Sequence, residues 1–160
     1  MSGAWDEVRS AIADKLDAST GCSTAGLRRA TTKTDEPLVM LPEVRVLQPG
    51  YTLQWQTGVT EAFTLDVPFE LVVSRPAGLK RSNPIAAAIA RAIQVEFQSG
   101  YRLSGLSLGL VNLTDCRLVS MTPGLVDYAD LTDPAGNPLD LDGYRGVVSV
   151  EVQESVTRSV

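Results

Sequence analysis

The sequence contains no histidine, and this absence restricts the chemistry open to the chain. Without imidazole there can be no Ser-His-Asp triad, no Cys-His dyad and no histidine ligand for a metal ion. The chain also lacks the GxxxxGK[ST] and GxGxxG patterns that bind nucleotide phosphates. Carboxylates, lysines and hydroxyls are the groups that remain. We therefore predict that the protein is not an enzyme and has no catalytic residue, cofactor or metal ion.

Cysteines and long apolar runs are also scarce. Cys22 and Cys116 are the only cysteines, and they lie far apart. A disulfide framework is excluded, a single bridge stays open, and two reduced thiols with Cys116 buried in a strand are favoured. No apolar run approaches the roughly 20 residues of a membrane-spanning helix. The N-terminal residues carry acidic side chains and lack the apolar core of a secretory signal. We therefore expect a soluble protein, made in the cytoplasm, with no membrane partner.

Basic residues are outnumbered by acidic ones. The chain has 14 Lys and Arg against 19 Asp and Glu, which gives a formal net charge of −5. This balance argues against a protein that grips nucleic acid, because neutralising phosphates needs clustered Lys and Arg. It is compatible with a surface that DNA slides past without sticking. Solubility alone explains the charge equally well.

The hydrophobic pattern predicts two helices. Residues 4–16 carry apolar side chains at spacings of three and four. Residues 84–97 follow Asn83, a good N-cap, and begin with Pro84, which suits the first helical position. Alanines fill much of this second helix, so it can lie close against a sheet. The predicted apolar positions are Trp5, Val8, Ile12 and Leu16 in the first helix, and Ile85, Ile89, Ile93 and Phe97 in the second.

Alternating apolar and polar residues predict the strands. The clearest strand covers residues 63–72. It contains Pro68, which we expect at a bulge or on the free side of an edge strand, because proline cannot donate a ladder hydrogen bond. Further strands are predicted over residues 38–47, 51–55, 111–121 and 144–155. Residues 1–160 thus form one domain of the α+β class, with a mostly antiparallel or mixed sheet of about four to five strands flanked by two α-helices.

Two long loops are predicted, over residues 17–37 and 123–143. The first is rich in Ser, Thr and basic residues, and no hydrophobic period survives in it. The second carries five aspartates, and Asp140 and Asp142 recur at the spacing of calcium ligands. The glutamate that closes such a calcium loop is absent, so consecutive turns explain this segment better than a metal site.

Some residues are candidates for a protein interface. Tryptophan is enriched at interfaces, although a single tryptophan more often packs inside. A basic turn precedes the second helix, and acidic side chains cluster in the second loop. The candidate interface residues are Trp55, Arg75, Lys80, Arg81, Asp127, Asp130 and Asp133.

Six segments together resemble the tail terminator family of long-tailed phages, and the resemblance covers most of the chain outside the two loops. They are the N-terminal helix, PEVRV (42–46), DVPFELVVSR (66–75), the alanine-rich helix IAAAIARAIQVEF (85–97) followed by SGYRL, DCRLVSM (115–121) and DGYRGVVSVEVQ (142–153). Related neck proteins of the same particles share a similar fold.

The resemblance implies a structural virion protein of the tail or neck. Tail terminators form a homohexameric ring that caps the tail tube, stops its polymerisation and offers the head-joining surface. The implied partners are further copies of this chain, the tail tube protein and a head completion or connector protein. DNA would pass through the lumen without specific binding. Glu151 and Glu154 are candidates to face that lumen, and assembly would take place in the host cytoplasm.

Three alternatives stay open. The first is another neck or head-tail joining protein of similar fold, which the number of subunits in the ring would distinguish. The second is a hydrolase that works through carboxylates and a divalent metal, which a calcium- or magnesium-dependent melting shift would reveal. The third is an adaptor domain that stays monomeric until it meets a partner, so its oligomeric state would identify it.

Overall fold

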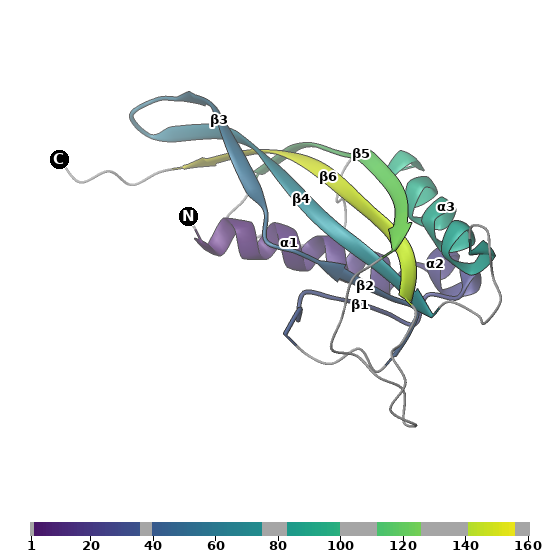
Figure 1. Cartoon of the computed structure of the whole chain (residues 1–160). Helices are drawn as coiled ribbons and strands as arrows, with labels where there is room; N and C mark the ends of the chain where they lie inside the picture. The colour runs from purple at the N-terminus through teal and green to yellow at the C-terminus, as the bar shows by residue number, and fades with distance from the viewer. Residues whose placement is uncertain (1, 36–39, 75–82, 100–111, 126–140, 156–160) are drawn as a thin grey trace.

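The computed structural model describes residues 2–35, 40–74, 83–99, 112–125 and 141–155 (Figure 1). A six-stranded mixed sheet and three helices make up this part of the chain, which confirms the α+β class. In chain order the elements are α1 (Ser2–Asp17), α2 (Thr20–Ala25), β1 (Arg29–Thr31), β2 (Glu43–Val46), β3 (Gly50–Gln56), β4 (Thr60–Ser74), α3 (Pro84–Ser99), β5 (Asn112–Leu125) and β6 (Leu141–Ser155).

The sheet is organised around the long strand β4. The strand order is β1-β2-β4-β6-β5, and β3 pairs with β4 beyond the end of β2. Only β1 and β2 run parallel, while every other pair is antiparallel. Because β3 and β4 are joined by a tight turn, they form a hairpin. In Figure 1 this hairpin projects at the upper left, at the opposite end of the sheet from α3.

One face of the sheet forms the hydrophobic core. In β4, Phe63, Leu65 and Val67 are at most 1% exposed, and the alternate residues to Val73 are buried with them. The alternate valines of β6 from Val148 to Val152 join the same cluster, together with side chains from α1 and α3. Both helices therefore cover one face of the sheet. The alternation predicted from the sequence places these residues on that face because successive strand residues point to opposite sides.

The two predicted helices are confirmed as α1 and α3. The Asn83 side chain accepts a hydrogen bond from the backbone N–H of Ile85 at 3.1 Å, as an N-cap does. Ile89, Ile93 and Phe97 are buried, but Ile85 is 45% exposed and lies off the core face. Among the helices that the structure describes, none is long and apolar enough to span a membrane.

The prediction for Pro68 is wrong, because β4 is a central strand. Pro68 pairs with Val147 of β6, and its carbonyl accepts a hydrogen bond from the Leu47 N–H at 2.8 Å on the other side. In an antiparallel strand the N–H and C=O of one residue point to the same side. The backbone nitrogen of Pro68, which carries no hydrogen, therefore points toward the short segment between the end of β2 at Val46 and the start of β3 at Gly50, where no strand requires a donor.

Much of the predicted loop over residues 17–37 is regular structure, so that prediction is wrong for these residues. Ser19 caps α2 by accepting a hydrogen bond from the Cys22 N–H at 3.2 Å, and Gly26 ends it with a φ of 117°. The strand β1 follows at once. The hydrophobic pattern did not reveal α2 because six residues show no apolar period. It did not reveal β1 because three residues are too few for an alternation.

The predicted loop over residues 123–143 is shorter than expected at both ends. The strand β5 continues to Leu125, although it was predicted to end at residue 121, and β6 already begins at Leu141. Pro123 is tolerated because β5 pairs only with β6 and its other edge is free of partner strands among the described residues. Residues 126–140, with most of the aspartates, lie outside the described residues.

At Gly146, β6 passes close to a core side chain. It pairs with Phe69 of β4 and Met121 of β5. A Cβ placed on Gly146 would overlap the Phe69 ring, with Cε1 at 2.6 Å, and would approach the Ser120 carbonyl to 2.9 Å. Since both ring and backbone are fixed by the sheet, no larger residue fits here.

We predict that Gly146→Ala lowers the free energy of unfolding by about 1–3 kcal/mol, the usual cost of overpacking a core. The measurement is urea denaturation followed by circular dichroism. Gly124→Ala is the matched control, because Gly124 also lies in a strand but has no atom within 4 Å of its added Cβ. Equal stabilities for the two variants would contradict the close approach of Phe69 to Gly146.

Candidate functional site

The β3–β4 hairpin carries an unusual concentration of exposed apolar side chains. All seven residues of β3 are exposed. Tyr51 is 52%, Leu53 47%, Trp55 43% and Val59 69% exposed. Trp55, a predicted interface residue, thus lies at the surface and not in the core. Clustered large apolar side chains at a surface mark an interaction site more often than scattered ones do.

Side-chain hydrogen bonds order the hairpin from within. At the turn, Thr57 Oγ1 accepts hydrogen bonds from the N–H groups of Val59 and Thr60, and the Thr57 N–H donates to the Thr60 carbonyl at 2.8 Å. Across the strands, Gln56 Nε2 donates to Glu61 Oε1 at 2.9 Å. A β-bulge between Leu53 and Trp55 shifts the register. The exposed side chains are therefore presented on an ordered hairpin, whose β4 arm also pairs with β6.

Aromatic rings tie the base of the hairpin to α1. The Trp5 and Tyr51 ring centroids lie 4.8 Å apart, and Tyr51 meets Phe63 edge-on at 6.4 Å. Phe63 is 1% exposed and belongs to the core, whereas Tyr51 is half exposed. The stack fixes the direction in which the hairpin leaves the body, because α1 and the core are themselves packed together.

The hairpin end of the sheet is acidic. Residues 50–66, 112–115 and 148–155, which pair with one another there, include no Lys or Arg. Their acidic residues are Glu61, Asp66, Asp115, Glu151 and Glu154. Glu151 pairs with Thr64, while Glu154 pairs with Glu61 nearer the end of the strand. The Glu154 side chain lies outside the described part of the structure.

A groove opens at the other end of the sheet, between α3 and β5. Its volume is about 780 Å³. The β5 strand has a bulge between Leu118 and Ser120, and Val119 within it is 56% exposed. Bulges commonly redirect a side chain at a sheet edge. The groove is lined by Ala87, Ala90, Arg91, Gln94, Phe97, Arg117, Leu118, Val119, Ser120, Met121 and Tyr144.

The charge of the groove is opposite to that of the hairpin. Arg91 and Arg117 line it, and no acidic residue lines it among those that the structure describes. Arg91 donates a hydrogen bond to Gln94 at 3.0 Å, and both arginines are exposed. Sequence analysis missed these two arginines because only the fold brings the α3 and β5 residues together.

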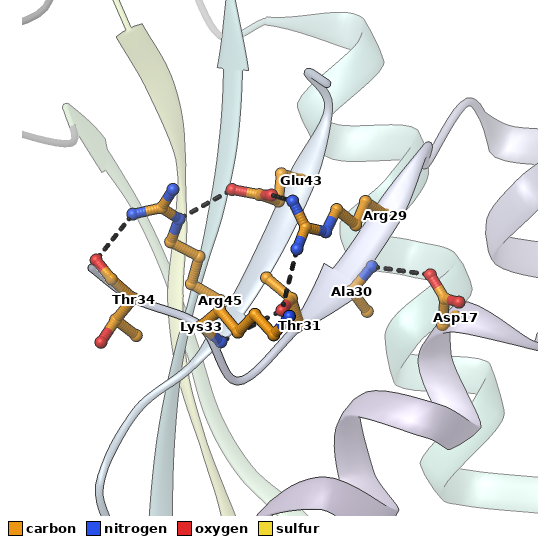
Figure 2. Close-up of polar contacts among 8 residues, drawn as sticks. All are labelled: Asp17, Arg29, Ala30, Thr31, Lys33, Thr34, Glu43 and Arg45. Carbon is orange, nitrogen blue, oxygen red and sulfur yellow. Dashed lines mark hydrogen bonds and ion pairs between the residues drawn. The ribbon is translucent and has the colours of Figure 1, made fainter. Parts of the chain in front are cut away.

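A buried ion cluster fastens the edge strand β1 to β2 on the face away from the helices (Figure 2). The Glu43 and Arg45 side chains are 0% and 3% exposed, and Arg45 Nε donates to Glu43 Oε2 at 2.7 Å. Arg45 Nη1 also donates to the Thr34 carbonyl at 2.9 Å, and Arg29 Nη1 lies 3.5 Å from Glu43 Oε1. We call this cluster a structural clamp, because Glu43 forms ion pairs with both Arg29 of β1 and Arg45 of β2. The paired charges in the PEVRV strand are the signal that could have revealed it.

The remaining predicted interface residues lie outside the described part of the chain. They are Arg75, Lys80 and Arg81 of the basic turn, and Asp127, Asp130 and Asp133 of the acidic loop.

Catalytic chemistry finds no support in the described residues. No group of three or more His, Cys, Asp or Glu side chains gathers there as a metal site would require. Cys22 and Cys116 form no disulfide, and Cys116 is buried in β5 as expected; Cys22 is buried as well. Burial raises the pKa of the Cys22 thiol, with a smaller opposing effect from its hydrogen bond with Ser19 and a further rise from nearby Glu96. A thiol held in its protonated form is a poor nucleophile.

We predict that Glu43→Gln destabilises the fold by about 3–5 kcal/mol, because it leaves the buried Arg45 cation without its counter-ion. The matched control is Glu70→Gln. Glu70 lies 3.6 Å from an Arg145 side chain that is 59% exposed, so water can replace this partner. We expect its loss to cost about 0–1 kcal/mol. Chemical denaturation of both variants measures the difference, and equal costs would show that the cluster is not a clamp.

The chain was compared with models of known protein families and with curated proteins, and neither comparison gave a match. The resemblance to tail terminators, which rests on strand and helix patterns, therefore stays a prediction. The observations that bear on function are the exposed apolar hairpin, the basic groove and the acidic hairpin end of the sheet.

Proposed function

We propose that this chain is a structural subunit of a ring that resembles the tail terminators of long-tailed phages. The ring would cap the tail tube, stop its polymerisation and offer a surface for head joining. Its partners would be further copies of this chain, the tail tube protein and a head completion or connector protein in the tail or neck of the virion. The observation that carries the proposal is the ordered hairpin with four large apolar side chains exposed.

The exposed hairpin supports the proposal of an assembling protein, because exposed apolar side chains do not stabilise a monomer. Tyr51, Leu53 and Trp55 would each lose contact with water when a partner covers them, and aromatic anchors of this kind dominate binding energy. Holding them on a hydrogen-bonded ribbon lowers the ordering cost of association. A ring also requires a heterologous contact, in which two different surfaces of one subunit meet.

The acidic hairpin end supports passage of DNA. Glu151 and Asp66 belong to the same face of the sheet, the one opposite the helices. The carboxylates would repel phosphates and keep the polymer from sticking. In the proposed ring this face would line the lumen near the hairpin.

The nearest alternative is another neck protein of similar fold, for which the same observations count equally. A ring with a number of subunits other than six would favour it. Nothing in the described residues favours the carboxylate hydrolase. Most of the aspartates on which that hypothesis depended lie within residues 126–140, outside the described part of the structure.

We predict that the purified chain, alone or with tail tubes, forms a hexamer of about 103 kDa, six times the 17.1 kDa chain mass. Burial of the apolar hairpin in each interface would drive its formation. Light scattering after size exclusion, with negative-stain images of the same peak, measures the mass and shows a central hole. A chain that stays monomeric at high concentration and also in the presence of tubes would contradict the proposal.

We predict that Glu151→Gln leaves the ring intact but slows DNA passage, because phosphates are less strongly repelled from the lumen wall. The measurement is the rate of DNA ejection from particles built with the variant. Glu70→Gln on the neighbouring strand serves as the control, since Glu70 already lies beside Arg145. Normal packaging and ejection by the Glu151 variant would mean that this glutamate does not face the DNA.

A further inference from the structure

Exposed large apolar side chains lie at the hairpin and also at the groove, at opposite ends of the described structure. Tyr51, Leu53, Trp55 and Val59 occupy the hairpin, and Val119 lies at the α3–β5 groove. In Figure 1 the hairpin is at the upper left and α3 with the adjoining part of β5 is at the right. Two different surfaces on one subunit are what a head-to-tail contact between identical subunits requires.

The hairpin turn and the groove differ in shape. All residues from Tyr51 to Val59 are exposed, and Val59 in the turn is 69% exposed. The β4 arm of the hairpin also pairs with β6 from Thr60 onward, so the turn at residues 57–59 is the narrow part of the hairpin. The groove is hollow, with a volume of about 780 Å³, and small alanines of α3 form one wall. A tight turn with an exposed apolar side chain can enter such a hollow.

The two surfaces also have opposite charges. Among the described residues, the groove lining presents Arg91 and Arg117 and no acidic side chain. The paired residues of the hairpin end, 50–66, 112–115 and 148–155, include Glu61 and Asp66 and no Lys or Arg. Opposite charges favour this pairing and disfavour contact of two hairpins or of two grooves. An isologous contact would place like charges together at either end.

We infer that the hairpin of one subunit docks in the α3–β5 groove of the next copy of this chain. Trp55 and Val59 enter the groove beside Val119, and Arg117 approaches the carboxylates of the incoming hairpin. Each subunit then gives its hairpin to one neighbour and its groove to the other, so the contact closes into a ring. This inference rests on the proposed ring function and names the surfaces that build it.

The test uses two variants of the full chain, each blocked at one surface. Trp55→Ser with Val59→Ser removes the apolar hairpin tip, and both side chains are exposed, so the fold should be retained. Ala87→Trp with Arg117→Glu fills the groove and reverses its charge. Met40→Ser is the matched control, because Met40 is 45% exposed but belongs to neither surface. Circular dichroism melting first confirms that each variant is folded.

Each blocked variant alone should lose the ring and run as a monomer in light scattering, while Met40→Ser keeps it. Mixed in equal amounts, the two blocked variants retain one intact contact. The hairpin of the groove-blocked chain still fits the groove of the hairpin-blocked chain. The expected product is a heterodimer of about 34 kDa, twice the 17.1 kDa chain mass, with nothing larger.

Other outcomes overturn the inference in distinguishable ways. If either blocked variant still forms the ring, or if the mixture stays monomeric, the hairpin and groove do not bind each other, and the proposed ring function stands. If the groove-blocked variant keeps the ring but no longer binds tubes, the occupant of the groove is the tube protein. A wild-type chain that forms no ring under any condition overturns both the inference and the proposed function.

Discussion

Burial of one face of β4 is the constraint on which the rest of the structure depends. Its alternate residues from Phe63 to Val73 form the middle of the core, where α1 and α3 both pack. Because β4 is 15 residues long, it extends past the end of β2 and can pair with β3 as well. The same strand therefore supplies the core at one end and the projecting hairpin at the other. A rigid core thereby holds the proposed interaction surface, which is how binding sites keep their geometry.

The charged residues are also distributed differently between the hairpin end and the other end of the sheet. At the β2 edge, Glu43 and Arg45 are buried and paired, so they hold β1 in place and contribute little to the outside field. Within the described part of the chain, the paired strands of the hairpin end carry acidic residues and no basic ones, and the groove lining contains Arg91 and Arg117 and no acidic residue. In the proposed ring, opposite charges at the two ends would orient identical subunits head to tail. A net charge of −5 at the same time opposes nonspecific binding of DNA.

Local pattern predicted the elements whose signals are contained in neighbouring residues. The N-cap Asn83, Pro84 and the apolar residues that follow every four positions predicted α3, and the two-residue alternation predicted β4 and β6. The elements α2 and β1 were missed. Six and three residues are too short for a period to show, and β1 exists because it pairs with β2 and because Asp17 accepts a hydrogen bond from the Ala30 N–H. Pro68 was misplaced because sequence cannot show that two partner strands meet beside it.

The sequence by itself determined the fold class, the buried face of the sheet and the absence of histidine chemistry, because each depends on composition or on residues close in the chain. It also placed Trp55 among the candidate interface residues. Only the tertiary structure decided that Trp55 lies on a projecting ribbon, that Arg91 and Arg117 meet across a groove, and that Glu43 and Arg45 are buried. These facts depend on which distant segments pack together, and strand pairing between distant residues leaves no local signal in the chain.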